Sequence, residues 1–124
     1  MPTIYDYYNS LYYDLKTGKI TNKCGKNGVS LSSIKFITNN INQIAYLLKY
    51  LISEFDENFG LFSPITTYQK AFEKEYKYII FKISIDTGKL TLMSTANFRN
   101  DAELNGHIQM AKTFGDKVVK LEGE

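Results

Sequence analysis

Apolar residues recur at helical spacing in the middle of the chain. One apolar stripe with a period of 3.6 residues is formed by Ile41, Ile44, Leu48, Leu51 and Phe55. The spacing predicts a helix over about residues 41–56. Asn40 can accept a hydrogen bond at its start, and Gln43 stands where a capping box has its second residue.

Two further helices have clear start signals. Ser63 is followed by Pro64, the usual order of a helix cap and first helical residue, so a second helix should begin there. Asn100 or Asp101 should open a last helix, which Gly115 ends. Its expected apolar positions are Ala102, Leu104, Ile108, Met110 and Ala111.

The second half of the chain also carries strand patterns. Residues 76–85 alternate between two faces, and one face is almost entirely apolar. A return strand at 90–94 and a closing strand at 118–121 complete this part. The glycine at position 88 predicts a tight hairpin turn between 76–85 and 90–94.

The first part of the chain predicts a β-meander. Gly18 and the pair Asn27–Gly28 are turn signals, and they separate strands ending near Leu15, running from 19 to about 24, and running from 29 to about 37. We take residues 4–9 as a short helix and 11–15 as strand.

The element order predicts an α+β fold. A single domain of residues 1–124 should form an antiparallel sheet built from hairpins, with about three helices packed on one face.

Charge narrows the function classes only slightly. The net charge is +2, and Arg99 is the single arginine. Arginine dominates bidentate recognition of phosphate and guanine, so its scarcity argues against sequence-specific DNA reading. The abundance of Lys, Asn, Ile and Tyr indicates AT-rich codons, typical of a low-GC bacterium, a phage or an archaeal virus.

Cysteine and hydropathy indicate an intracellular protein. Cys24 is the only cysteine, so no disulfide can form within the chain. The amino terminus has no signal-peptide pattern, and the longest apolar stretch falls well short of the roughly 20 residues that span a membrane. We expect a cytoplasmic protein without a membrane segment.

Tyrosines crowd the amino terminus, and they are the first candidate site. Half of the 10 tyrosines lie within the first 13 residues, at Tyr5, Tyr7, Tyr8, Tyr12 and Tyr13. A helix or strand has two faces, so these five rings cannot all point into the core of a small domain. Some of them should be exposed or contact a partner. Tyrosine is enriched at binding hot spots, and it also stacks on nucleobases. A partly buried rim of the core explains the same residues without any partner.

The hairpin loops are rich in lysine. Residues 15–35 contain no acid, and the expected contacts to phosphate or nucleic acid are Lys16, Lys19, Lys23 and Lys26. Ammonium groups beside glycine turns can hold a phosphate, although the spacing is not that of a P-loop. Ordinary solvated hairpin loops are the favoured explanation of the run, and contact with a polyanion is the alternative.

A polar patch at the start of the last helix is the third candidate, formed by Asn97, Arg99, Asp101, Glu103 and His107. Glu103 and His107 are four residues apart and share a helix face. Two such residues do not make a metal site, and no second cluster completes one, so we expect no metal and no cofactor. A capped helix start explains the patch as well.

These observations favour a non-enzymatic binding module that docks on another protein and forms homo-oligomers. A viral or mobile-element factor that inhibits a host protein fits the inferred source. The alternative is a nucleic-acid or nucleotide-binding protein using the Tyr/Lys-rich meander. A second alternative is a small enzyme centred on Arg99, Glu103 and His107.

Overall fold

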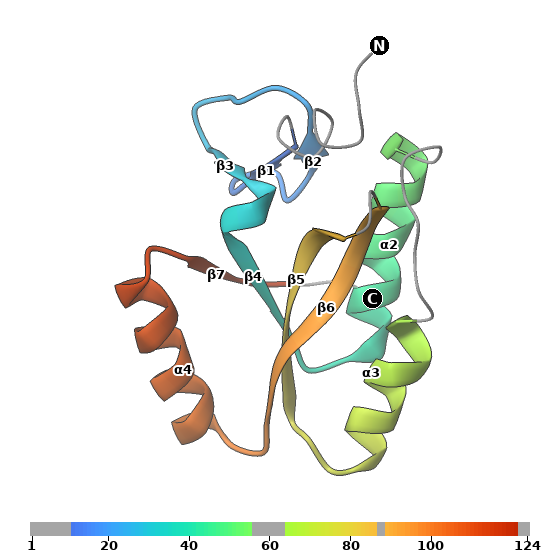
Figure 1. The fold of residues 1–124 in the computed structure, drawn as a ribbon, viewed down its shortest axis with the longest axis vertical. Coiled ribbons are helices and arrows are strands. Elements are labelled where there is room, and N and C mark those ends of the chain that lie inside the picture. Colours follow the sequence, from blue (N-terminus) through green and yellow to red (C-terminus); the bar gives the residue numbers. More distant parts are fainter. Residues whose placement is uncertain (1–10, 56–63, 87–88, 122–124) are drawn as a thin grey trace.

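The computed structural model describes residues 11–55, 64–86 and 89–121 (Figure 1). Its elements in chain order are β1 (Tyr12–Asp14), β2 (Ile20–Thr21), β3 (Gly28–Ser30), the 3-10 helix η1 (Leu31–Ser33), β4 (Ile34–Thr38), α2 (Ile41–Phe55), α3 (Pro64–Glu73), β5 (Tyr78–Asp86), β6 (Lys89–Phe98), α4 (Asp101–Thr113) and β7 (Lys117–Lys120). The α+β class is confirmed. The short helix expected at 4–9 lies outside the described residues.

The larger sheet has four strands in the order β6-β5-β4-β7. Strand β5 is antiparallel to both β4 and β6, and its register with β6 shifts between Ile80 and Phe81. Strand β7 lies parallel to β4 at one edge. The sheet was expected to be antiparallel, and the structure shows that it is mixed. Helix α4 returns the chain to the end of the sheet where β4 begins, so β7 then runs in the same direction as β4.

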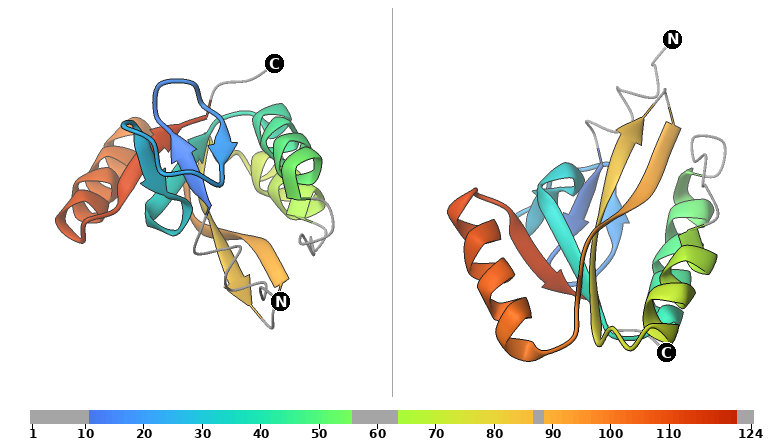
Figure 2. Two further views of the ribbon diagram at one scale, coloured as in Figure 1. Left: turned by 90° about the horizontal axis from the view of Figure 1, so that it is seen from above. Right: turned by 60° about the horizontal axis from the view of Figure 1, so that its bottom comes forward.

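Helices cover both faces of this sheet. Helix α4 lies on one face, whereas α2 and α3 lie on the other (Figure 2). The expectation of helices on a single face is wrong for α4. The physical reason is that successive side chains of a strand point to opposite faces of the sheet, and both faces of β4 and β5 carry apolar residues. The neighbouring residues Phe36 and Ile37, for example, are both buried, each in a different cluster.

The main core fills the face covered by α2 and α3. Phe36 and Phe81 stack at its centre with ring centroids 5.7 Å apart, and Tyr68 of α3 contacts Phe81. Ile44, Leu47 and Leu48 bring the apolar stripe of α2 onto the same cluster. The smaller cluster on the α4 face contains Ile37, Ile80 and Leu104. Burial on both faces makes β4 and β5 the central strands of the protein.

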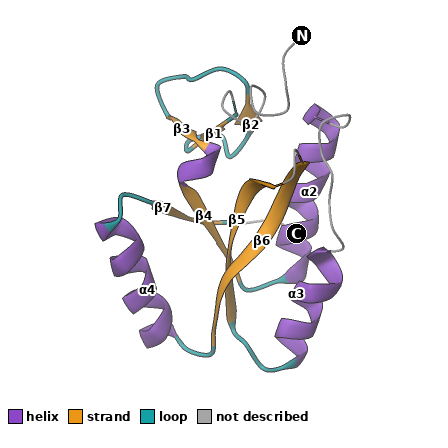
Figure 3. Cartoon of the chain, in the orientation of Figure 1, coloured by secondary structure: helices purple, strands orange, loops and turns teal. Residues whose placement is uncertain are grey.

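A second, three-stranded sheet lies at one end of the molecule (Figure 3). Its order is β2-β1-β3, so β3 pairs with β1 and not with β2. The predicted meander, with a hairpin at Asn27–Gly28, is therefore wrong in its pairing. Both edges of β1 are satisfied, since the Asp14 amide donates to the Lys19 carbonyl and the Leu15 amide donates to the Asn27 carbonyl.

The strand expected at 29–37 is two strands joined by η1. The turn of η1 moves the chain from the small sheet to the large one, and Leu31 inside it is buried in the main core. Periodicity alone does not show this break, because the residues on either side of η1 both have strand-forming sequences.

Helix α2 begins at the predicted cap, but the Gln43 side chain bonds Thr38 and not Asn40. The Asn40 side chain accepts from the Asn42 amide at 2.8 Å, which confirms the cap. Gln43 does not reach back to Asn40 as a capping box requires. The Asn40 amide donates to the Thr38 hydroxyl at 3.0 Å, and the Gln43 side chain bonds the same hydroxyl. Thr38 is fully buried, so one hydroxyl holds the β4–α2 turn.

We expect Thr38→Val to lower the free energy of unfolding by about 1–3 kcal/mol, because it keeps the shape but leaves buried partners without a hydrogen bond. Urea denaturation measures the change. Thr113→Val is the matched control, since its exposed hydroxyl bonds only the Gln109 carbonyl. Equal stability of the two variants would show that the Thr38 hydroxyl has no structural role.

Candidate functional site

The carboxyl end of α4 is shaped by a local motif that ends the helix. Gly115 has φ of 84°, a backbone conformation that favours glycine. The Gly115 amide donates to the Lys112 carbonyl and the Asp116 amide to the Ala111 carbonyl, both at 3.0 Å. This is the Schellman pattern, and it confirms the end predicted at Gly115. It leaves Phe114 at the last position of the helix and directs the chain into β7.

Phe114 and Met110 form an exposed apolar patch on this end of α4, which we call the Met110–Phe114 patch. Phe114 is 78% exposed and Met110 is 60% exposed. Residues four apart on a helix are neighbours, and the Phe114 amide bonds the Met110 carbonyl at 3.2 Å, so the helical geometry extends to Phe114. Of the apolar positions expected in this helix, Leu104 and Ala111 are buried, whereas Met110 is exposed.

Charged side chains lie beside the apolar cluster between α4 and the sheet. Asp116 lies 3.4 Å from the Lys82 ammonium and 4.0 Å from that of Lys35. The Lys35 ammonium also lies 3.3 Å from Nε2 of His107, whose ring contacts Phe98 at 5.2 Å between centroids. We call Lys35, Lys82, His107 and Asp116 the ionic cluster. It is half-buried and joins β4, β5, α4 and the start of β7.

The ionic cluster keeps His107 neutral. An ammonium can only donate, so Nε2 accepts from Lys35 and the proton of the ring belongs on Nδ1. Burial, and secondarily the positive charge of Lys35, lowers the pKa of His107 below its ordinary value of 6.5. These contacts hold α4 on the sheet.

The other residues of the predicted polar patch have separate surroundings. The Arg99 guanidinium lies 5.3 Å from the centre of the Tyr76 ring. Asp101 pairs with Lys77 at 3.4 Å, and hydrogen bonds from Tyr78 and Lys77 lower the pKa of its carboxyl.

Asn97 and Glu103 are exposed, and the Glu103 amide donates to the Asn100 side chain as the predicted cap. Among the described residues no side-chain hydrogen bond or ion pair joins Arg99 or Glu103 to His107. The geometry gives the enzyme hypothesis no support.

The amino-terminal candidates are only partly described. Tyr5, Tyr7 and Tyr8 lie outside the described residues. Tyr12 is half-buried, and Tyr13 is buried in the main core, where its ring meets Phe36 edge-on. Tyr13 is therefore a core residue, and a binding role for the other tyrosines stays a prediction.

The four predicted phosphate-contacting lysines are Lys16, Lys19, Lys23 and Lys26, and all four are exposed. They lie in the loops on either side of β2, so the small sheet carries them on its connections. A contact to nucleic acid stays a prediction for them.

Sequence reasoning missed Phe114, Lys82 and Asp116, and it grouped Lys35 with the lysines of the loops and not with an ionic cluster. Phe114 stands next to the glycine that ends α4, and a large apolar residue at that position is a detectable signal. The ionic cluster joins residues up to 81 positions apart in the chain, from Lys35 to Asp116. Only the fold brings these together.

No family model, curated protein or solved structure matches this chain. In the part of the chain that the structure describes, no three His, Cys, Asp or Glu side chains gather where they could hold a metal ion. No helix within the same residues has the length and apolar character needed to cross a bilayer.

We expect the stability of the protein to fall as the pH drops below about 6.5. The unfolded chain binds a proton at His107 near its ordinary pKa of 6.5, whereas the folded protein holds that pKa lower, so acid favours unfolding across this window. Urea midpoints at pH 7 and pH 5.5 measure the effect.

The control is His107→Gln, which should lose this part of the pH dependence. The depressed pKa values of Asp14 and Asp101 act only below their ordinary value of 3.8, outside the window. An unchanged slope in His107→Gln would contradict the assignment.

Proposed function

We propose that the chain is a binding module that docks on another protein through the Met110–Phe114 patch. The observation that carries this proposal is the exposed Phe114 ring beside exposed Met110. Single exposed apolar residues are common on protein surfaces. Two large ones on neighbouring turns, on an element whose other side is anchored, resemble the aromatic anchor of a binding hot spot.

Charge around the patch favours an acidic partner. The residues from Leu104 to Leu121 include three exposed lysines, Lys112, Lys117 and Lys120. The one acid in this segment is Asp116, and Lys82 and Lys35 already compensate it. An acidic protein surface with an apolar pocket therefore complements this end of α4. Two copies of the same basic surface would repel each other, so the patch supports a different protein over self-association.

We expect a photo-reactive benzoylphenylalanine at position 114 to cross-link an acidic protein in cells that naturally contain this chain. The same group at Gln69, an exposed position on α3, is the control and should give no such product. With the partner purified, Phe114→Ser should weaken binding about 30-fold or more, as a hot-spot residue does, while Gln69→Ser leaves it unchanged. Calorimetry measures both.

Two results would contradict the proposal. One is equal affinity of Phe114→Ser and the unchanged protein for the cross-linked partner. The other is a nucleic-acid product at position 114. That product would be confirmed by single-strand binding whose log K falls with log salt by roughly 0.7 for each phosphate contacted. Sedimentation of the protein without a partner, at tens of micromolar, tests self-association. If the patch joined two copies of this chain, Phe114→Ser would lower the mass measured for the protein alone.

A further inference from the structure

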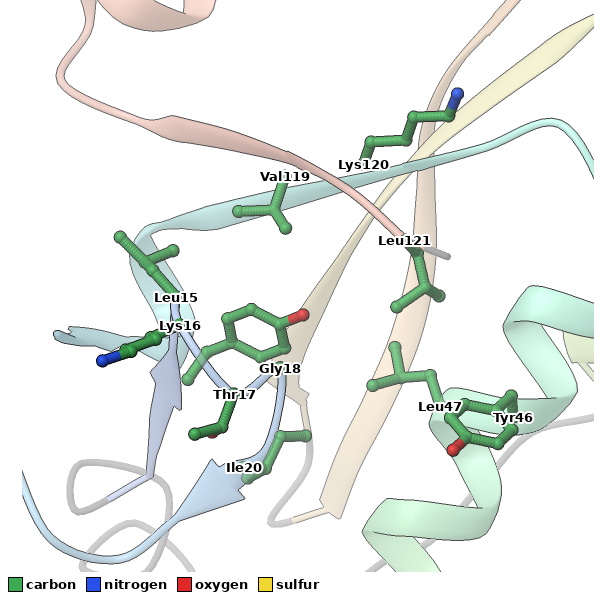
Figure 4. Close-up of a pocket in the computed structure, with 11 residues that line it drawn as sticks. Leu15, Lys16, Thr17, Gly18, Ile20, Tyr46, Leu47, Val119, Lys120 and Leu121 are labelled. Carbon is green, nitrogen blue, oxygen red and sulfur yellow. The ribbon is translucent and has the colours of Figure 1, made fainter. Parts of the chain in front are cut away.

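A cavity lies beside the contact between the small sheet and the rest of the protein. Its volume is about 350 Å³, within the size range of small-molecule sites. The turn of the β1–β2 hairpin forms one side, and α2 and the end of β7 form the other (Figure 4). The wall is mixed: its aliphatic side chains are Leu15, Ile20, Leu47, Val119 and Leu121, and polar groups line the rest.

The Tyr13 hydroxyl is the notable polar group in this wall. Tyr13 is 6% exposed, and no hydrogen-bond partner for its hydroxyl exists among the described residues. In the same part of the chain, no completely enclosed side-chain oxygen or nitrogen lacks a partner. The unpartnered hydroxyl therefore reaches open space, and the space it borders is the cavity.

Gly18 keeps that hydroxyl accessible. A Cβ atom at Gly18 would lie 3.4 Å from the Tyr13 hydroxyl oxygen, and the φ of 70° at this residue disfavours any side chain. Burial raises the pKa of the Tyr13 hydroxyl, so it stays protonated and can donate a hydrogen bond. A ligand that uses this group must supply an acceptor.

The charges at the cavity favour an anionic acceptor. The lining residues include two lysines, Lys16 and Lys120, and no Asp or Glu. Figure 4 shows the Lys16 side chain extending away from Leu47 and the Lys120 side chain extending away from Leu121, so both ammonium groups point out of the cavity. Asp14 lies next to the lining residue Leu15, and its carboxylate accepts hydrogen bonds from the amides of Lys16 and Thr17 in the turn.

We propose that this cavity binds a small molecule with an apolar body and one oxyanion, either a carboxylate or a phosphate ester. The apolar body would contact Ile20, Leu47 and Leu121, and the oxyanion would accept from the Tyr13 hydroxyl. Lys16 at the rim supplies the compensating charge. This site is separate from the Met110–Phe114 patch and does not depend on the docking function.

The test is a titration of the full chain, followed by two-dimensional amide NMR, with benzoate, phenyl phosphate and benzylamine as probes. We expect saturable shifts with benzoate or phenyl phosphate at the cavity residues, and none with benzylamine. The stronger of the two anions identifies the ligand class. The anions are titrated up to 10 mM, about the weakest dissociation constant expected for ligands of this size. The proposal would be overturned if neither anion gave a saturable shift, or if benzylamine bound more tightly than the anions.

Three variants assign the binding to the cavity. Tyr13→Phe should weaken the anion about tenfold, since it removes one hydrogen bond to a charged group and nothing else. Leu15→Trp should block the mouth, because Leu15 is an exposed lining residue. Tyr68→Phe removes another buried tyrosine hydroxyl of the same core away from the cavity and should change nothing. Equal affinity of Tyr13→Phe and Tyr68→Phe would contradict the assignment.

Discussion

Burial of both faces of β4 and β5 is the constraint on which the structure depends. Phe36 and Phe81 face the main core, and Ile37 and Ile80 face α4, so each of these two strands buries apolar residues on both faces. A sheet of this kind needs a cover on each face. The small sheet, α2 and α3 supply one cover, and α4 alone supplies the other. The division places the two candidate binding features on different parts of the molecule.

The single helix on the second face explains why its exposed side is free to bind. Leu104 and Ala111 meet the sheet, and the ionic cluster completes the contact with charged groups where the apolar cluster ends. The Schellman end at Gly115 then leaves Phe114 outside. A chain that only needed to close its sheet would gain nothing from an exposed phenylalanine there, and this is the physical basis of the docking proposal.

The elements that sequence predicts well are those with local causes. The stripe from Ile41 to Phe55 is one helix, and Asn40 and Asn100 cap helices, because each of these features depends on residues within a few positions. Gly18 and Gly115 both adopt positive φ, as their turn and helix-end signals require.

Pairings between distant segments could not be predicted from the sequence. Periodicity shows which residues share a face but not which element covers that face, so α4 was expected beside α2 and α3. The pairing of β3 with β1 has the same origin, since a turn at Asn27–Gly28 is compatible with either neighbour. Met110 is a large apolar residue of the kind found in cores. Only the orientation of α4 about its own axis, as it packs on the sheet, shows that Met110 is exposed.

The most direct test is the accessibility of phenylalanine rings to a soluble paramagnetic gadolinium chelate, measured by NMR on the dilute protein. We predict strong relaxation enhancement for Phe114, an intermediate effect for half-buried Phe98 and almost none for Phe36 and Phe81. A Phe114 ring as protected as Phe36 in the monomer would show that α4 turns a different side to solvent, and it would contradict the account of how the second face is closed.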